Sequence, residues 1–375
     1  MTVVAKSSVS AVAGFVVGLP LVRELWRVRA EIGATRRALR EHAGSSPAGS
    51  TRFHNSEPAT EVADGGALTV AKAMLQRVDE VRPSGPIPLV HSDFGPASAE
   101  LAVTWLGHAS VLFEIDGHTV LADPVWESRV SPSTWLGPTR LHAAPLGLAE
   151  LPEIDAVVIS HDHYDHLERS TIVWLAEHRR CRFVVPIGLG EHLRGWGVPA
   201  ERVIELTWGQ RASVGALELV CTEVRHFSGR GLRRNDTLWS GWAILGPTAR
   251  AYFGGDSGYS ACFERTGLEL GPFDVTVLPI GAYSEFWPDV HMNPEEALRA
   301  HQDLNPGATA ALLPIHWATF VLARHSWSEP IERLVAAVDA AVADGNVGAA
   351  LLIPRPGERM VVGDEPDVET WWRGL

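Results

Sequence analysis

The chain has 375 residues, of which 46% are hydrophobic and 21% are charged, and its formal net charge is −13. This composition is typical of a globular protein. It excludes a collagen-like, a mostly disordered or a polytopic membrane protein, because no uncharged apolar run reaches the roughly 18–20 residues that a spanning helix needs. The excess of acidic residues also argues against a nucleic-acid partner, because proteins that bind nucleic acid usually carry a basic surface.

The N-terminal segment, residues 1–45, differs from the rest of the chain in charge. Its first 40 residues carry seven basic side chains and two acidic ones. Leu21, Leu25, Val28 and Ile32 recur there at helical spacing. Three interpretations stay open: a cleaved signal peptide, a basic amphipathic helix on an anionic membrane surface, and a helix packed on the protein body. The second predicts a membrane-associated or cell-envelope protein, and the third is compatible with the cytoplasm.

Residues 46–100 begin with a stretch rich in Gly, Ser, Pro and Thr, which is typical of a linker or a wrapping arm. The body, residues 101–375, alternates short apolar runs with helical patterns and predicts an α/β sandwich of layers in one domain. The expected strands are 103–106, 118–122, 156–160, 182–185, 217–222, 250–253, 275–278 and 311–315. The expected helices are 167–178, 191–195, 294–304 and 329–343. Isolated Cys181, Cys221 and Cys262 form no disulfide or metal motif and are expected to be buried apolar residues.

The strongest chemical signal is the run Ser160-His161-Asp162-His163-Tyr164-Asp165-His166, directly after an apolar strand. Imidazole nitrogens and carboxylate oxygens are the ligands that a divalent cation such as zinc prefers. His161 and His163 are two residues apart, so both point to one side of an extended segment. Asp165 and His166 can turn toward a second position nearby. The run therefore predicts a metal site.

Three further ligand-type side chains, His226, Asp256 and His316, each follow the end of an apolar run. The carboxyl ends of strands are where sheet-based enzymes gather their sites. Two glycines precede Asp256 and let the backbone approach a metal closely. We therefore expect these side chains to join the histidine-rich loop.

These motifs resemble the metallo-β-lactamase-fold hydrolases. More narrowly, Trp105-Leu-Gly-His-Ala-Ser110, the histidine-rich loop and Pro314-Ile-His-Trp-Ala-Thr-Phe320 are similar to the N-acyl-phosphatidylethanolamine-hydrolysing phospholipase D branch and its bacterial relatives. The resemblance implies a four-layer αββα sandwich and two zinc ions, with iron or manganese as alternatives. It implies His161, His163 and His226 on one zinc, Asp165, His166 and His316 on the other, and Asp256 bridging them.

Several residues are candidates for supporting roles. Asp123 is our candidate for holding the ligand loop, because metal-bound histidines usually donate their second N–H to a carboxylate or carbonyl. A turn-initiating aspartate is the alternative for Asp123. Asp162 is expected to act similarly to Asp123. His108 is expected to be structural, with a place at the edge of the site as the alternative, and His301 and His325 are expected on the surface.

Two residues are candidate substrate contacts. His291 lies two residues before Asn293-Pro-Glu-Glu296, a predicted helix start, and so belongs to a loop free to face a site. The phospholipase branch has a substrate-contacting histidine at the matching place and a tyrosine that matches Tyr164. The resemblance therefore implies that Tyr164 and His291 contact a phosphate or headgroup. Spacing alone favours a surface histidine and a packed tyrosine.

The expected function is that of a dizinc phosphodiesterase of phospholipase D type, with Asp165 and Asp256 as catalytic carboxylates. Its substrate would be N-acyl-phosphatidylethanolamine or a related phospholipid or small phosphodiester, cleaved to N-acylethanolamine and phosphatidic acid. The attacking group would be a hydroxide shared by two cations. A metal-dependent lactonase or amide hydrolase of the same fold is the alternative, and a catalytically silent scaffold is a third hypothesis.

Overall fold

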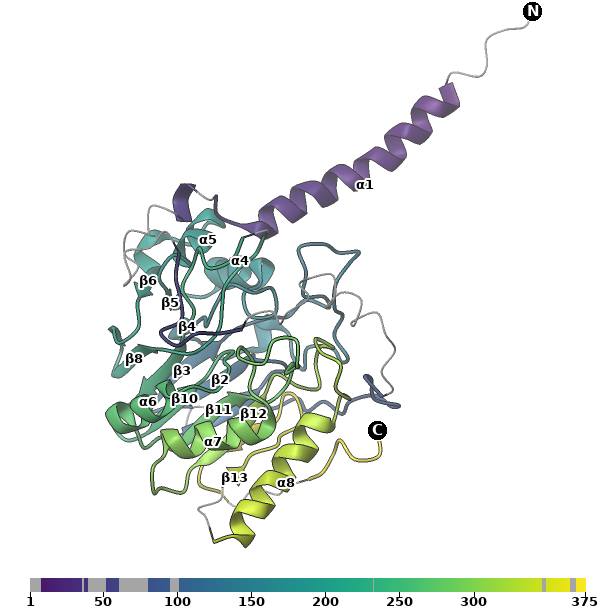
Figure 1. Ribbon diagram of the computed structural model, residues 1–375. Coiled ribbons are helices and arrows are strands. Elements are labelled where there is room, and N and C mark those ends of the chain that lie inside the picture. The colour runs from purple at the N-terminus through teal and green to yellow at the C-terminus, as the bar shows by residue number, and fades with distance from the viewer. Residues whose placement is uncertain are drawn as a thin grey trace, which may run out of the picture.

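The computed structural model describes residues 8–35, 37–39, 52–60, 80–94, 101–231, 233–345, 349–364 and 369–375. Two seven-stranded sheets pack face to face and helices cover both outer faces (Figure 1). In the first sheet the order is β14-β1-β2-β3-β4-β5-β6, and in the second it is β13-β12-β11-β10-β9-β8-β7. This arrangement confirms the four-layer αββα sandwich of the metallo-β-lactamase fold.

The strands of the first sheet are β1 (Leu101–Trp105), β2 (Val111–Ile115), β3 (His118–Ala122), β4 (Ala156–Val158), β5 (Arg182–Pro186), β6 (Val203–Leu206) and β14 (Arg359–Val361). Those of the second sheet are β7 (Arg211–Val214), β8 (Leu217–Thr222), β9 (Gly241–Leu245), β10 (Arg250–Phe253), β11 (Val275–Pro279), β12 (Ala311–Ile315) and β13 (Ala350–Leu351). Strands β3 to β6 run parallel, as do β10 to β13. The parallel strands therefore end together at one edge of each sheet.

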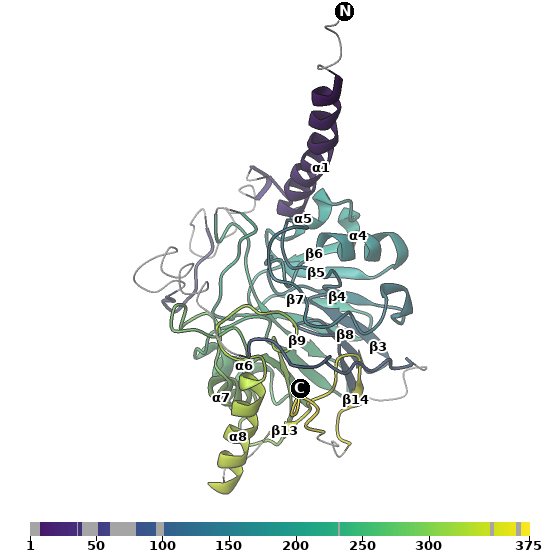
Figure 2. The same cartoon turned by 90° about the vertical axis from the view of Figure 1, so that its right-hand side faces the viewer.

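Both faces of the central strands are buried, because helices cover the outside and the other sheet covers the inside. In β2, Val111 and Phe113 enter the core between the sheets, whereas Leu112 packs outward against α4 (Arg169–His178). Helices α4 and α5 (Gly190–Gly195) lie outside the first sheet. Helices α6 (Cys262–Leu270), α7 (Pro294–Leu304) and α8 (Glu329–Ala343) lie outside the second (Figure 2).

Each expected strand corresponds to an observed strand, and each of the four expected helices is present, with ends that agree within two residues. Strands β2, β6, β7, β9, β13 and β14 were not predicted. Cys181, Cys221 and Cys262 are free and buried, as expected.

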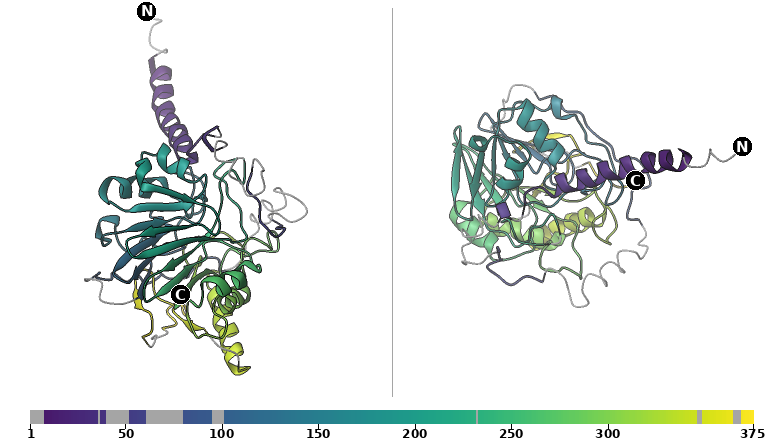
Figure 3. Two further views of the ribbon diagram at one scale, coloured as in Figure 1. Left: turned by 90° about the vertical axis from the view of Figure 1, so that its left-hand side faces the viewer. Right: turned by 90° about the horizontal axis from the view of Figure 1, so that it is seen from above.

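The N-terminal helix α1 (Ser8–Ile32) stands away from the sandwich and joins it only near its C-terminal end (Figures 1 and 3). Among the helices that the structure describes, none has both the length and the apolar character needed to cross a membrane. Much of the expected linker or arm, including residues 46–51, 61–79 and 95–100, lies outside the described residues. Its described part reaches the body at Phe53, which packs with Val224, Leu238 and Trp239.

Candidate metal centre

The predicted ligands gather at one edge of the sandwich because each follows the carboxyl end of a strand. His161 comes after β4, His226 after β8, Asp256 after β10 and His316 directly after β12. Strands β8, β10 and β12 run in the same direction within the second sheet, so their carboxyl ends lie at the same edge although the residues are far apart in sequence. The structure thus brings together all seven residues that the sequence predicted as ligands, which are His161, His163, Asp165, His166, His226, Asp256 and His316.

One group of donors consists of three histidines. Nε2 of His161 lies 2.8 Å from Nδ1 of His163, and Nε2 of His226 lies 3.4 Å from that same Nδ1. All three rings are buried or half-buried. Burial holds the pKa values of His161 and His226 well below the usual range, so both rings are neutral and each has one nitrogen free to accept or to bind a metal. Neutral imidazoles that converge in this way suit a divalent cation.

The second group contains a carboxylate and three histidines. Oδ2 of Asp165 lies 2.9 Å from Nε2 of His108, 3.5 Å from Nε2 of His316 and 3.6 Å from Nε2 of His166. His108 follows β1, so the signal that identified the other ligands also applies to it. Its ring contacts a carboxylate of the cluster, so the structure favours the alternative given for His108, a place at the edge of the site, over a purely structural role.

Asp256 joins the two groups. Its Oδ2 lies 3.1 Å from Nε2 of His166 and 3.2 Å from Nε2 of His316, both in the second group. The same oxygen lies 3.9 Å from Nε2 of His161 and 3.8 Å from Nε2 of His226, in the first group. One carboxylate oxygen therefore lies within reach of both groups, which is the position of a bridging ligand.

The carboxylates and histidines of the cluster shift one another's pKa values. Burial opposes the ionised forms of Asp165 and Asp256, but the neighbouring histidines hold both pKa values well below the usual range. In turn, burial lowers the pKa of His316, but the nearby carboxylates of Asp256 and Asp165 outweigh burial and raise it to about 9. Nε2 of His166, Nε2 of His316 and Oδ1 of Asp256 are buried without a hydrogen-bond partner among the described residues. Such nitrogen and oxygen donors fit divalent cations.

Asp123 orients the ligand loop through hydrogen bonds to His166 and Ser160. Its Oδ2 accepts a hydrogen bond from Nδ1 of His166 at 2.7 Å, and its Oδ1 accepts one from the backbone N–H of Ser160 at 2.7 Å. The Ser160 hydroxyl donates to Asp123 at 2.5 Å and accepts from Nδ1 of His161 at 2.9 Å. His226 likewise donates from Nδ1, to the carbonyl of Val290. These bonds leave Nε2 of each histidine free to face the cluster.

A buried arginine fixes the other side of the loop. Arg230 donates to the carbonyls of Asp162 and Leu167 at 2.9 and 2.7 Å, and to that of Glu31 at 2.8 Å. Its guanidinium stacks on the ring of Tyr164, 4.1 Å from the centroid. The Asp162 carboxylate accepts from the backbone N–H of Gly229 and from the hydroxyl of Thr237. Neither partner is a predicted ligand histidine, so a role for Asp162 like that of Asp123 stays a prediction.

Backbone strain concentrates around the cluster. Among the few non-glycine residues with positive φ are His108, Asp123 and His316, at 53°, 40° and 66°. Gly255, just before Asp256, also has positive φ, and a Cβ there would lie 2.5 Å from Cβ of Ser160. Strain of this kind persists only where the surrounding structure enforces it, and it is typical of functional sites.

The two candidate substrate contacts lie in different surroundings. His291 faces the cluster, with Nδ1 3.9 Å from Oδ2 of Asp256 and its ring 5.1 Å from that of His226. Tyr164 instead donates its hydroxyl to the carbonyl of Arg230 at 2.7 Å. A substrate role for Tyr164 therefore stays a prediction.

The expected surface position of His301 is wrong. Only 3% of it is exposed, because α7 turns this residue toward β11, where Nδ1 lies 2.7 Å from the hydroxyl of Thr276. His325 is half-buried, and its Nε2 accepts from the backbone N–H of Ala282.

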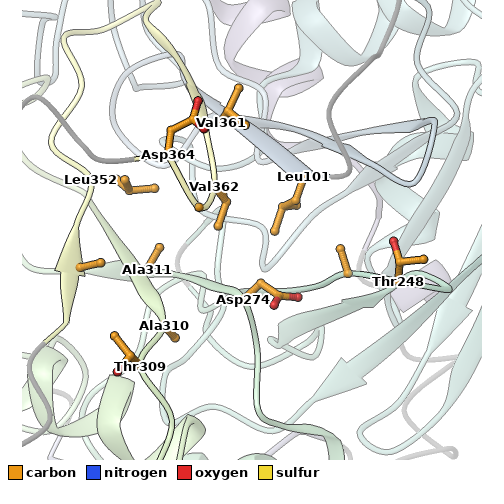
Figure 4. Close-up of a pocket in the computed structure, with 13 residues that line it drawn as sticks. Leu101, Thr248, Asp274, Thr309, Ala310, Ala311, Leu352, Val361, Val362 and Asp364 are labelled. Atoms are coloured by element: carbon orange, nitrogen blue, oxygen red, sulfur yellow. The ribbon is translucent and has the colours of Figure 1, made fainter.

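A separate cavity of about 540 Å³ opens at the opposite end of the sandwich, where β1, β11 and β12 begin and β14 ends (Figure 4). Leu101 at the start of β1 and Ala311 at the start of β12 contribute to its wall. None of the described residues that line it is a histidine, and the carboxylate of Asp274 is occupied by the backbone N–H of Arg250. The histidine cluster is therefore the candidate active site.

A two-sheet sandwich with histidines and aspartates converging at its carboxyl edge defines a metal-dependent hydrolase of the metallo-β-lactamase fold. The model of the family described as "Beta-lactamase superfamily domain" matches residues 118–317, and the chain belongs to this family. An uncharacterised protein of Mycobacterium tuberculosis is 47% identical over 366 residues, covering 96% of each chain.

A second relative and one solved structure are also similar to the chain. The N-acyl-phosphatidylethanolamine-hydrolysing phospholipase D 1 of Caenorhabditis elegans is 35% identical over 268 residues, which are 68% of this chain and 74% of that protein. The solved structure of a metallo hydrolase from Ignicoccus hospitalis shares the fold, with a TM-score of 0.51 and 23% identity over 69% of this chain and 97% of that chain.

Proposed function

We propose that the protein is a phosphodiesterase of phospholipase D type that uses two zinc ions to hydrolyse N-acyl-phosphatidylethanolamine or a related phospholipid. The observation that carries this proposal is the position of Asp256 Oδ2 within 3.9 Å of histidine nitrogens from both donor groups. The relative from Caenorhabditis elegans, which spans two thirds of the chain, supports the substrate class.

The residues divide between two cations. His161, His163 and His226 would hold one ion, and Asp165, His166 and His316 would hold the other, with Asp256 shared. Two such ions, when bound, lower the pKa of water and neutralise charge on a phosphoryl oxygen. In the net reaction water adds its oxygen to phosphorus, the bond from phosphorus to the ethanolamine oxygen breaks, and that oxygen takes up a proton.

His291 is the residue best placed to contact the phosphate. It lies at the edge of the cluster, and burial lowers its pKa to about 4, so it is neutral at neutral pH and can donate one hydrogen bond. We expect His291→Ala to raise KM without loss of metal. Loss of metal in this variant would instead make His291 a ligand.

The test is an assay of the zinc-loaded protein on N-acylated phosphatidylethanolamine, with phosphatidic acid and N-acylethanolamine as the measured products. A lactone and an N-acyl amide serve as comparison substrates. Release of both products in equal amounts supports the proposal. Hydrolysis of the lactone or amide with the phosphodiester left intact would refute it and make the protein a different hydrolase of the same family.

A further inference from the structure

An exposed apolar surface lies beside the candidate active site, formed by two segments far apart in sequence. On α1 the exposed fractions are 60% for Leu25 and 69% for Trp26, and Leu21 and Val22 are each about half exposed. On the loop after β3 they are 56% for Trp135 and 73% for Leu136. We call the set the apolar rim, consisting of Leu21, Val22, Leu25, Trp26, Trp135 and Leu136.

Helix α1 presents its apolar face outward. Three described α1 side chains that contact the body, Glu24, Arg27 and Glu31, lie on one face and are half-buried or buried. Helical geometry places residues 21, 22, 25 and 26 within about 140° of arc, turned away from that contact face. A surface helix of a globular protein normally buries its apolar face, and here the described body leaves that face uncovered.

The two parts of the rim are fastened to each other. The carboxylate of Glu24 accepts hydrogen bonds from the hydroxyl of Ser133 at 2.6 Å, and from the backbone N–H and hydroxyl of Thr134 at 2.8 and 2.9 Å. Arg27 pairs with Glu127 at the start of the same loop. Trp135 and Leu136 follow immediately, so helix and loop form one continuous surface.

The charge around the rim is positive. Both described acidic residues of α1 are turned to the protein: Glu24 binds the loop, and Glu31 lies 3.7 Å from the guanidinium of Arg230. Arg23 and Arg29 are exposed on the helix. The body of the chain is acidic, so this local reversal of charge favours a negatively charged partner.

The base of the loop lies against the candidate site. Val125 and Val130 pack with Phe320 and Tyr164, and the ring of Phe320 lies 5.1 Å from that of His108 in the second donor group. Tyr164 itself belongs to the ligand loop. The loop that carries Trp135 and Leu136 therefore begins next to the metal centre.

We propose that the apolar rim docks the protein on an anionic lipid bilayer, with Trp135 and Leu136 entering the interface and Arg23 and Arg29 facing lipid phosphates. Aromatic and aliphatic side chains flanked by arginine are the pattern of surfaces that lie in the membrane interface without spanning it. Docking does not depend on the proposed function. Its consequence, delivery of phospholipid to the metal centre, rests on that function.

The test is co-sedimentation of the full chain with vesicles of phosphatidylcholine, alone or mixed with phosphatidylglycerol. We expect binding to the mixed vesicles, reduced roughly tenfold or more by W135S/L136S. R23Q/R29Q should weaken binding by roughly fivefold per arginine, and only where phosphatidylglycerol is present. Leu268→Ser is the matched control, because Leu268 is 72% exposed on α6, on the other outer layer, and should bind as wild type does.

Three outcomes would overturn the inference. One is that the wild-type chain binds neither kind of vesicle. Another is that Leu268→Ser and W135S/L136S lose binding to the same extent. The third is a dimer in light scattering that W135S/L136S converts to monomer, since the rim would then cover a second copy of the chain.

A water-soluble short-chain phosphodiester distinguishes failure of docking from failure of the proposed function. The W135S/L136S variant should hydrolyse it at the wild-type rate and lose activity only on vesicles.

Discussion

The substitution Asp123→Asn tests how the protein prepares its histidines for metal. The Asp123 carboxylate accepts three hydrogen bonds, from Nδ1 of His166 and from the backbone N–H and hydroxyl of Ser160. An amide of the same size offers only one oxygen. If its NH₂ group faces His166, Nδ1 must become the acceptor and the proton moves to Nε2, the atom that faces Asp256 at 3.1 Å. The tautomer needed for metal binding is then lost.

The expected size of this effect is roughly 10–100-fold in metal affinity or activity, as for other residues that orient a metal-bound histidine. Metal retention after dialysis against a graded series of zinc chelators measures it, with turnover followed alongside. The matched control is Asp155→Asn, an exposed aspartate of the same strand pair whose carboxylate accepts from the backbone of Thr119, away from the cluster. Wild-type zinc affinity and turnover in Asp123→Asn would show that this carboxylate does not set the tautomer of His166.

Three further predictions concern other parts of the structure. Asp256→Asn should remove the shared ligand and lower turnover by a factor of roughly 1,000 or more, which a single-turnover assay would measure; activity close to wild type would exclude a bridging role. Arg230→Met should leave three buried carbonyls without their donor and lower the free energy of unfolding by about 3 kcal/mol, measured by denaturant titration. An unchanged unfolding midpoint would show that the hydrogen bonds of Arg230 do not stabilise the loop. Burial lowers the pKa of His301 to about 4, so below its ordinary value of 6.5 the unfolded chain takes up a proton that the folded chain does not. Stability should therefore fall by up to about 3 kcal/mol between pH 6.5 and pH 4, and His301→Gln should flatten this part of the unfolding profile.

Much of the fold could be predicted because its central strands are continuous apolar runs bounded by Gly, Pro or Asp. The unpredicted strands lack that signal. Strand β9 begins with a glycine that ordinarily marks a turn, and β13 and β14 have two and three residues each. Strand β14 pairs with β1 across most of the chain length, and no local pattern contains that information.

The candidate site was predictable to the extent that its residues follow strands. His108 shows how far that rule extends, because it also follows a strand, and the structure places it on Asp165. For His301 the spacing from Ala297, Leu298 and Leu304, all buried, already indicated the inner face of α7. Which hydroxyl or carbonyl each group contacts depends on packing between distant segments, as the bond from Tyr164 to Arg230 illustrates.

The most direct test of a two-metal centre is the metal content of three proteins purified under zinc-replete conditions: wild type, His226→Ala and His316→Ala. His226 belongs to the first donor group and His316 to the second. We expect about two zinc ions per wild-type chain and about one in each variant, because each substitution opens one group and leaves the other intact. Less than one ion in wild type, or two ions retained in both variants, would contradict a metal centre built from these two groups.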